Sequence, residues 1–263
     1  MSKVAQVKFV DYQTSIAKAL DLINVGEKLP GDELIIIKPN LTLASPPPVT
    51  TDVKAAKAVY FYCKAHTKTT IAIGEGCGSG TTPNVYKKLG YTDFAKKYGI
   101  ELIDFNDAET VTLENENAFQ LKRFYIPKIV QDAYVISLPV LKDHSFTETT
   151  IAMKNMFGIA PGKFYSGGWN KSKLHSPSTD KSVVDVCLYK KPDLSIVDAS
   201  VALTGMHLSG RHKNIGLILA SFDPVAIDTV GSRLLGHDPA ALPYLTLANN
   251  LLGSMDNPEI IME

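Results

Sequence analysis

Short apolar segments with strand character alternate with amphipathic segments with helix character along most of the chain. The segment 33–37 (Glu-Leu-Ile-Ile-Ile) is typical of a strand that is buried on both faces of a parallel sheet. Further predicted strands lie at 4–10, 69–73, 100–105, 133–138, 194–197 and 215–220. Predicted helices lie between and after them, at 14–23, 52–64, 84–89, 93–98, 149–157, 180–189, 225–235 and 242–251. Because repeated β–α units build sheets covered by helices, the sequence predicts an α/β fold with a mostly parallel, helix-flanked open sheet.

Two segments depart from this alternation. Residues 110–126 have the pattern of a small β-ribbon insertion, which we expect as an antiparallel addition at an edge of the sheet. Residues 160–178 form the longest stretch without a predicted helix or strand, and loops of this length often act as lids or interaction surfaces. We expect both segments to belong to a single α/β domain that spans residues 1–263.

The charge balance and the cysteines narrow the classes of partner. The chain has 27 basic and 27 acidic residues, whereas nucleic-acid and anionic membrane surfaces normally carry a basic excess. No apolar stretch approaches the ~20 residues of a membrane span, and the N-terminal segment lacks the apolar core of a secretion signal. The three cysteines and six histidines show no metal-binding spacing. We therefore expect a cytoplasmic protein without nucleic-acid or membrane partners and without a metal site.

Polar side chains follow several predicted strands at the points where the strands end. Pro39 terminates the first of these strands, so Lys38 and Asn40 flank its end. A second group, Lys142 and His144, follows the strand 133–138. Because the carboxyl ends of parallel strands meet at one edge of a sheet, we expect these side chains to share a cleft. The alternative is a solvated loop with ordinary surface lysines.

Lys154 and Asn155 interrupt an otherwise apolar helical segment. Burial of these two side chains without partners would be costly, so we expect them to face the same cleft. Asp228 lies within an apolar helix and needs a partner for the same reason, whereas Asp223 before Pro224 is accounted for as a helix N-cap. Asp198 follows a predicted strand and is the stronger acidic candidate for the site.

Residues 74–80 (Gly-Glu-Gly-Cys-Gly-Ser-Gly) form a glycine-rich turn after another strand. Glycines allow backbone amides to approach an anion closely, so Gly76 and Ser79 are candidate contacts for a phosphate group. Glu75 fits poorly beside an anion unless it transfers a proton or binds a metal. The pattern is neither a Walker A loop nor a dinucleotide fingerprint, and a turn without a ligand is the alternative.

Five of these segments together resemble the conserved microbial domain of unknown function 362. The matching motifs occur in the family's order: Lys-Pro-Asn at 38–40, Gly-Glu-Gly at 74–76, Leu-Pro-Val-Leu-Lys-Asp-His at 138–144, Lys-Asn-Met-Phe-Gly at 154–158, and Ser-Phe-Asp-Pro-Val-Ala-Ile-Asp at 221–228. The resemblance implies a site built from these motifs. Members of the family often occur with ferredoxin-like iron–sulfur modules, but this chain has no cluster-binding run of cysteines.

The combined observations predict a cleft that binds a small anionic metabolite, either a carboxylate or a phosphorylated compound; no cofactor is specified. The expected ligand-binding residues are Lys38, Asn40, Gly76, Ser79, Lys142, Lys154 and Asn155. His144 is the expected general acid or base because the ordinary pKa of histidine is near neutrality, and Asp198 or Glu75 would orient it or act separately.

The alternative is a non-catalytic partner of a separate iron–sulfur protein. Phe164, Tyr165 and Trp169 in the long loop would then be aromatic anchors of the interface. An exposed Trp169 would favour docking, and a Trp169 folded over the polar residues would favour a lid.

Overall fold

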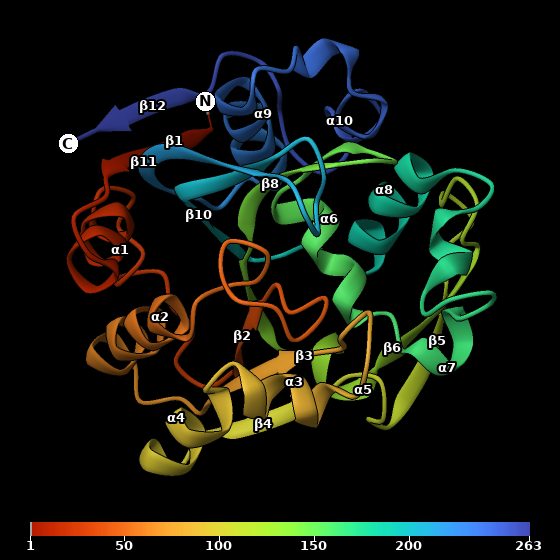
Figure 1. Cartoon of the computed structure of the whole chain (residues 1–263), viewed down its shortest axis with the longest axis horizontal. Helices are drawn as coiled ribbons and strands as arrows, with labels where there is room; N and C mark the ends of the chain where they lie inside the picture. The colour runs from red at the N-terminus through yellow and green to blue at the C-terminus, as the bar shows by residue number, and fades with distance from the viewer. Residues whose placement is uncertain (1) are drawn as a thin grey trace.

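The computed structural model describes residues 2–263, which fold around one large sheet flanked by helices (Figure 1). Its strands follow the order β12-β1-β11-β10-β7-β2-β3-β4. The strands from β10 to β4 along this path are parallel neighbours, so their carboxyl ends lie at the same edge. The bounds are β1 (Lys3–Lys8), β2 (Ile35–Pro39), β3 (Ile71–Glu75), β4 (Glu101–Asp104), β7 (Tyr134–Leu138), β10 (Leu194–Thr204), β11 (Arg211–Ser221) and β12 (Glu259–Met262). This arrangement confirms the predicted mostly parallel α/β sheet.

Helices cover both faces of the sheet because alternate side chains of its central strands are apolar on both sides. Ile35 and Ile37 pack in one core with the first four helices, whereas Ile36 packs in a second core with helices from the C-terminal half. The first group is α1 (Tyr12–Asp21), α2 (Val53–His66), α3 (Thr82–Lys88) and α4 (Tyr91–Tyr98). The second group includes α6 (Ala152–Asn155), α8 (Thr179–Tyr189), α9 (Pro224–Leu235) and α10 (Pro243–Ala248).

The predicted ribbon exists, but its expected position was wrong. Strands β5 (Thr110–Glu114) and β6 (Arg123–Pro127) form a separate two-stranded sheet and do not extend the main one. The carboxylate of the buried Asp185 in α8 accepts hydrogen bonds from the backbone N–H groups of Phe119, Gln120 and Leu121 at 2.6–2.8 Å. These charge-assisted bonds hold the ribbon against the helical layer.

Residues 140–150 form a hairpin where a polar loop and the start of a helix were predicted. Strand β8 (Val140–His144) pairs with β10, and β9 (Glu148–Thr150) pairs with β8 in antiparallel fashion. The apolar pattern stops after Leu141, but backbone pairing continues through the polar residues. Helix α6 therefore begins at Ala152 instead of residue 149.

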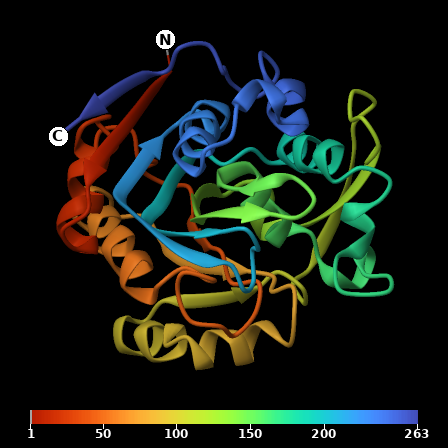
Figure 2. The same cartoon turned by 45° about the horizontal axis from the view of Figure 1, so that its top comes forward.

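Strands β10 and β11 are longer than predicted and form an antiparallel hairpin. Each has eleven residues, and the outer residues of β11, from Arg211 to Asn214, are exposed and polar. That polar outer half hides the strand from hydrophobic pattern analysis. The C-terminal strand β12 was also missed; it pairs in parallel with β1 at the sheet edge (Figure 2).

The segment 160–178 contains short helical turns and is not an irregular loop. They are α7 (Gly162–Tyr165) and η2 (Ser172–His175), preceded by η1 (Met156–Ile159). Turns of four residues are too short to produce a helical hydrophobic period. The remaining short elements are α5 (Lys128–Gln131) and η3 (Pro239–Ala241).

Candidate functional site

A cavity of about 270 Å³ lies beyond the carboxyl ends of β2 and β3 and beside β8. We call it the lysine cavity, because three lysines and three histidines contribute to its wall. The polar lining residues include Asn40, Glu75, Ser79, Lys142, His144, Lys154, Asn155, Lys171, His175 and His207. Of the strand-end candidates, Lys38 lies directly beneath this wall through its contacts with Glu75 and Asn155. The sheet topology therefore brings the lysine and asparagine candidates together.

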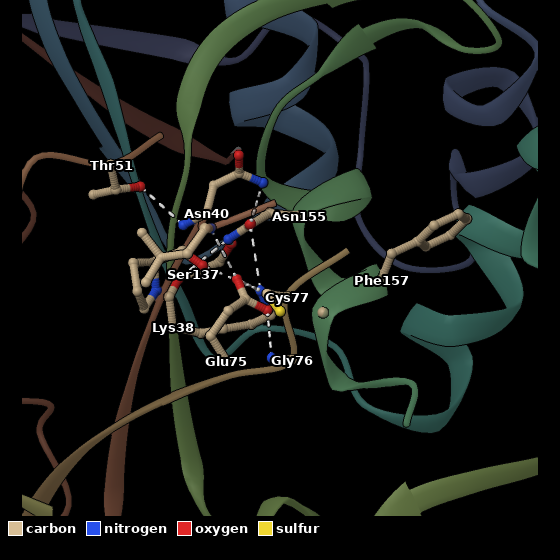
Figure 3. A network of polar contacts seen from close by, with 12 residues as sticks. Lys38, Asn40, Thr51, Glu75, Gly76, Cys77, Ser137, Asn155 and Phe157 are labelled. Atoms are coloured by element: carbon tan, nitrogen blue, oxygen red, sulfur yellow. Dashed lines mark hydrogen bonds and ion pairs between the residues drawn. The ribbon is translucent and has the colours of Figure 1, made fainter. Parts of the chain in front are cut away.

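A buried ion pair between Lys38 and Glu75 forms the floor of the site (Figure 3). The Lys38 Nζ lies 2.9 Å from Glu75 Oε2, 3.2 Å from the carbonyl oxygen of Pro39 and 3.4 Å from Asn155 Oδ1. These three acceptors match the three protons of the ammonium group. Burial lowers the pKa of Lys38, and the Glu75 carboxylate opposes that shift. Lys38 is thus engaged within the protein and does not offer a free N–H to a ligand.

The two asparagines connect this floor to Lys142. Asn155 Nδ2 donates to the Lys38 carbonyl and to Ser137 Oγ, while Asn40 Nδ2 donates to Asn155 Oδ1 (Figure 3). Asn40 Oδ1 accepts a hydrogen bond of 2.6 Å from Lys142 Nζ, which also donates to the Val49 carbonyl at 2.8 Å. Two of the three Lys142 protons are therefore used. Burial lowers the pKa of Lys142 to about 7.

Lys154 differs from the other lysines of the site. Within residues 2–263 its ammonium has no hydrogen-bond partner, although its residue is only 7% exposed. Its Nζ lies 3.7 Å from the centroid of the Phe157 ring. Burial, followed by the charges of Lys142 and Lys171, holds the pKa of Lys154 well below its ordinary value.

The short helix α6, which carries Lys154, is held by a buried carboxyl group. Asp228 Oδ1 accepts from the Ala152 N–H at 2.8 Å, and Asp228 Oδ2 accepts from the Met153 N–H and the Tyr244 hydroxyl at 3.3 Å each. Burial raises the pKa of Asp228 to about 8. The predicted need of Asp228 for partners is confirmed, and its partners position Lys154.

Lys171 belongs to the site, and sequence reasoning missed it. Its Nζ donates to the carbonyl oxygens of Gly76, Phe157 and Gly158 at 2.6, 3.2 and 3.1 Å. Burial lowers the pKa of Lys171 to about 8. Because all three protons are used, Lys171 ties the segment 160–178 to the glycine-rich turn. The one feature of the sequence that pointed to Lys171 was its position in the long segment 160–178, for which no helix or strand was predicted.

Three histidine rings form one side of the lysine cavity. The centroid of the His144 ring lies 4.3 Å from that of His207 and 6.1 Å from that of His175. His175 and His207 were not among the predicted site residues. The three histidines are far apart in the sequence, so no local motif predicts that their rings form a cluster.

Hydrogen bonds assign the tautomers of two of these rings. His144 Nδ1 accepts from the Phe146 N–H at 3.1 Å, so its neutral ring carries the proton on Nε2. His175 Nδ1 donates to the Lys171 carbonyl at 3.2 Å, which leaves its Nε2 as an acceptor. Burial and Lys154 lower the pKa of His144, and they lower that of His175 to about 4. Burial and the neighbouring lysines likewise lower the pKa of His207 to about 4. At neutral pH His144 is therefore a hydrogen-bond donor in this geometry, and His175 keeps an open nitrogen.

The glycine-rich turn uses its amides within the protein. The Gly76 N–H donates to Glu75 Oε1 at 2.8 Å, the Cys77 N–H to Thr82 Oγ1, and the Gly78 N–H to the Thr42 carbonyl. These amides are not directed at a bound phosphate, which corrects the cradle interpretation for Gly76. Ser79 is exposed and lies on the wall of the cavity.

Asp198 does not join the other candidates. It lies within β10 and not at a strand end, because β10 continues to Thr204. Its carboxylate accepts from the Tyr12 hydroxyl at 2.8 Å and from the backbone and hydroxyl groups of Ser200. Asp198 is absent from the lining of the lysine cavity. These contacts give it a role in packing between β10 and α1.

Trp169 and its neighbours bear on the choice between a lid and a docking loop. Trp169 is 51% exposed, yet it lines the cavity and its ring centroid lies 4.6 Å from that of His175. Phe164 stacks on Tyr125, and Tyr165 is buried with its hydroxyl accepting from the Tyr125 N–H. Two of the three proposed anchors are therefore used in packing. Trp169 meets both parts of the criterion, since it is exposed and also contacts a residue of the cavity wall, so the lid and the docking loop both stay predictions.

We expect Gly158→Ala to destabilise the protein, because a Cβ atom at this position would lie 1.9 Å from Glu75 Oε1 and 2.4 Å from Lys38 Nζ. Forced overpacking of this kind typically costs about 1–3 kcal/mol in the free energy of unfolding. Urea titration followed by circular dichroism measures the loss. The matched control is Gly168→Ala, whose Cβ would meet nothing within 4 Å. Equal stability of the two variants would show that the floor of the site is less tightly packed than described.

Two further observations concern metals and membranes. Residues 2–263 contain no group of three or more histidine, cysteine, aspartate or glutamate side chains arranged to hold a metal ion. No helix in this part of the chain is both long and apolar enough to cross a membrane.

Comparison with known proteins agrees with the motif resemblance. The chain is 29% identical over 229 residues to a thylakoid-associated protein of Synechocystis sp., and the match covers 84% of this chain and 68% of that protein. A family model described as a domain of unknown function matches residues 35–233, a range that contains every lysine, histidine and asparagine of the site described above. The chain belongs to the DUF362 family.

Proposed function

We propose that the protein binds a small anionic metabolite, with a carboxylate or a phosphate group, in the lysine cavity. The main support for this proposal is the balance of basic and acidic side chains that line the lysine cavity. Lys142, Lys154 and Lys171 line the cavity, while Glu75, the one carboxylate in its lining within the described range 2–263, is already paired with Lys38. A cavity with an excess of cations and few anions raises the local concentration of anionic ligands.

Three groups are free to donate to such a ligand. Lys142 keeps one proton that no protein oxygen accepts, Lys154 has N–H groups without a protein acceptor among residues 2–263, and His144 presents its Nε2–H. Each charged donor in a partly desolvated site contributes about 1.5–3 kcal/mol when paired. Lys38, Lys171 and the two asparagines would hold these donors in position and would not themselves contact the ligand.

The proposed binding has a definite pH dependence. Burial lowers the pKa of Lys142 to about 7, so its ammonium is lost as the pH rises through that value. A bound anion stabilises the ammonium and raises its pKa, and binding is therefore coupled to proton uptake above pH ~7. Affinity should fall as the pH increases from about 6 to about 9.

We expect phosphate, sulfate or small carboxylates to raise the melting temperature at pH 6 relative to chloride at equal ionic strength, and to do so less at pH 9. Ligand at about 100 times its Kd stabilises a protein by roughly 2.7 kcal/mol. Differential scanning fluorimetry measures the shift.

The Lys142→Met variant should lose most of this shift, whereas the same substitution at the exposed Lys96 of α4 should keep it. Equal melting temperatures for the parent protein in all these anions at pH 6 would refute the proposal.

We further propose a cytoplasmic location. The name of the Synechocystis protein associates that relative with thylakoids, which makes membrane association the competing location for this chain. Fractionation of cells into soluble and membrane pools distinguishes the two.

A further inference from the structure

Lys154 differs from the other lysines of the site because its Nζ has no protein oxygen acceptor among residues 2–263 and lies over the face of the Phe157 ring. The other three lysines of the site donate to protein oxygen atoms. The Lys154 Nζ has no such acceptor among residues 2–263 and is directed against an aromatic face on the wall of the lysine cavity. The Lys154 Nζ is not among the fully buried polar atoms that lack a partner, so it reaches the space of the lysine cavity, where a ligand can approach it.

These surroundings affect the reactivity of the Lys154 amine toward carbonyl carbon. Only a neutral amine can attack carbon, and a lysine with an ordinary pKa of ~10.4 is less than ~0.1% neutral at pH 7. Desolvation and neighbouring cations favour the neutral form and are the two means by which proteins activate lysine. Burial, Lys142 and Lys171 lower the pKa of Lys154 by both of these means.

We propose that Lys154 forms a Schiff base with the carbonyl carbon of an anionic oxo compound, of the 2-oxo acid or phosphorylated aldehyde class, bound in the lysine cavity. This inference rests on the proposed anion binding and names the reacting group and the substrate class. Lys154 is then a catalytic residue, whereas Lys142 and the His144 Nε2–H would hold the anionic group of the substrate.

The step balances without an oxidant or reductant. The Nζ lone pair forms a bond to the carbonyl carbon, and the carbonyl oxygen takes up a proton to give a carbinolamine. The carbon–oxygen bond then breaks, the hydroxyl group leaves as water with a second proton, and the nitrogen gives up the two protons consumed. One water molecule is released for each imine formed.

Proton transfer requires a group with a free lone pair beside the amine. His175 Nε2 keeps a free lone pair, because the Nδ1 proton of this ring is donated to the Lys171 carbonyl, and we assign it this role. The Phe157 ring contacts both partners: Lys154 Nζ lies 3.7 Å from its centroid, and the His175 ring packs against it with centroids 5.4 Å apart. Trp169 packs on His175 and would limit the access of water to the imine.

Reductive trapping tests the proposal. The full chain is incubated at pH 7 with pyruvate, glyoxylate, 2-oxoglutarate or glyceraldehyde 3-phosphate in the presence of sodium cyanoborohydride, which reduces an imine to a stable secondary amine. We expect one adduct per chain with at least one of these compounds, located by peptide mapping on Lys154. The adduct should form on Lys154 before it forms on exposed lysines such as Lys96, because burial and the neighbouring cations favour the neutral, nucleophilic form of Lys154.

Two variants and a measurement of phosphate binding distinguish failure of the Schiff base proposal from failure of the anion-binding proposal. Lys154→Arg should abolish the fast adduct, whereas Lys96→Arg should retain it; circular dichroism checks that both variants are folded. Because the adduct is also mapped in the unaltered protein, the assignment does not depend on the variant. An adduct spread over exposed lysines, or none at Lys154, would overturn the Schiff base. If phosphate still raised the melting temperature in that case, anion binding would stand, and if it did not, both proposals would fail.

Discussion

Glu75→Gln is expected to lower the free energy of unfolding by about 3–5 kcal/mol, because it leaves a buried lysine without its counter-ion. Lys38 is 0% exposed, and its ammonium lies 2.9 Å from the Glu75 carboxylate. The same carboxylate also accepts the backbone N–H groups of Leu41 and Gly76, so the loss affects the ends of both β2 and β3. Urea unfolding at pH 7 measures the change.

Two comparisons isolate the buried charge as the cause. The double variant Lys38→Met with Glu75→Gln removes both charges, and we expect it to be more stable than Glu75→Gln alone. Glu114→Gln makes the same change in the exposed pair between Glu114 and Arg123, where we expect no measurable loss. A Glu75→Gln variant as stable as the Glu114→Gln variant would contradict the ion pair at the floor of the site.

Asp228→Ala is expected to cost about 2–5 kcal/mol and to weaken the response to phosphate. The substitution leaves the Ala152 and Met153 N–H groups without acceptors at a fully buried position. These two residues form the first turn of α6, so the same change loosens the helix that carries Lys154. Urea unfolding gives the stability, and the melting temperature with and without phosphate gives the response of the site.

The control for this variant is another aspartate, Asp238, which caps a helix and does not line the lysine cavity. Asp238 accepts from the Ala240 N–H at the exposed start of η3. Asp238→Ala should cost about 0.5–2 kcal/mol, typical of a lost cap, and should leave the phosphate response unchanged. An Asp228→Ala variant with a full phosphate response would show that α6 does not depend on this carboxyl group to position Lys154.

Hydrophobic patterns in the sequence predicted strands best where the strand is short and apolar throughout. The run at 33–37 predicted a strand buried on both faces, and the structure divides its isoleucines between two cores. Patterns failed where polar residues continue a strand, as in β8 and the outer part of β11, because backbone pairing does not require apolar side chains. Asp198 shifted from a predicted strand end to the interior of β10, because this strand continues past the polar Asp198 through Val201, Ala202 and Leu203.

The sequence by itself determined that lysines, asparagines and a histidine follow the strands of one sheet, and parallel strands necessarily bring their ends to a common edge. It did not determine the function of each side chain. That depends on hydrogen bonds between residues far apart in the chain: Lys142 and Asn40 are separated by 102 positions, and Lys171 and Gly76 by 95. Only the tertiary structure decided that Lys38, Lys142 and Lys171 have oxygen acceptors and that Lys154 has none among residues 2–263, because burial and partner geometry arise from packing and not from local sequence.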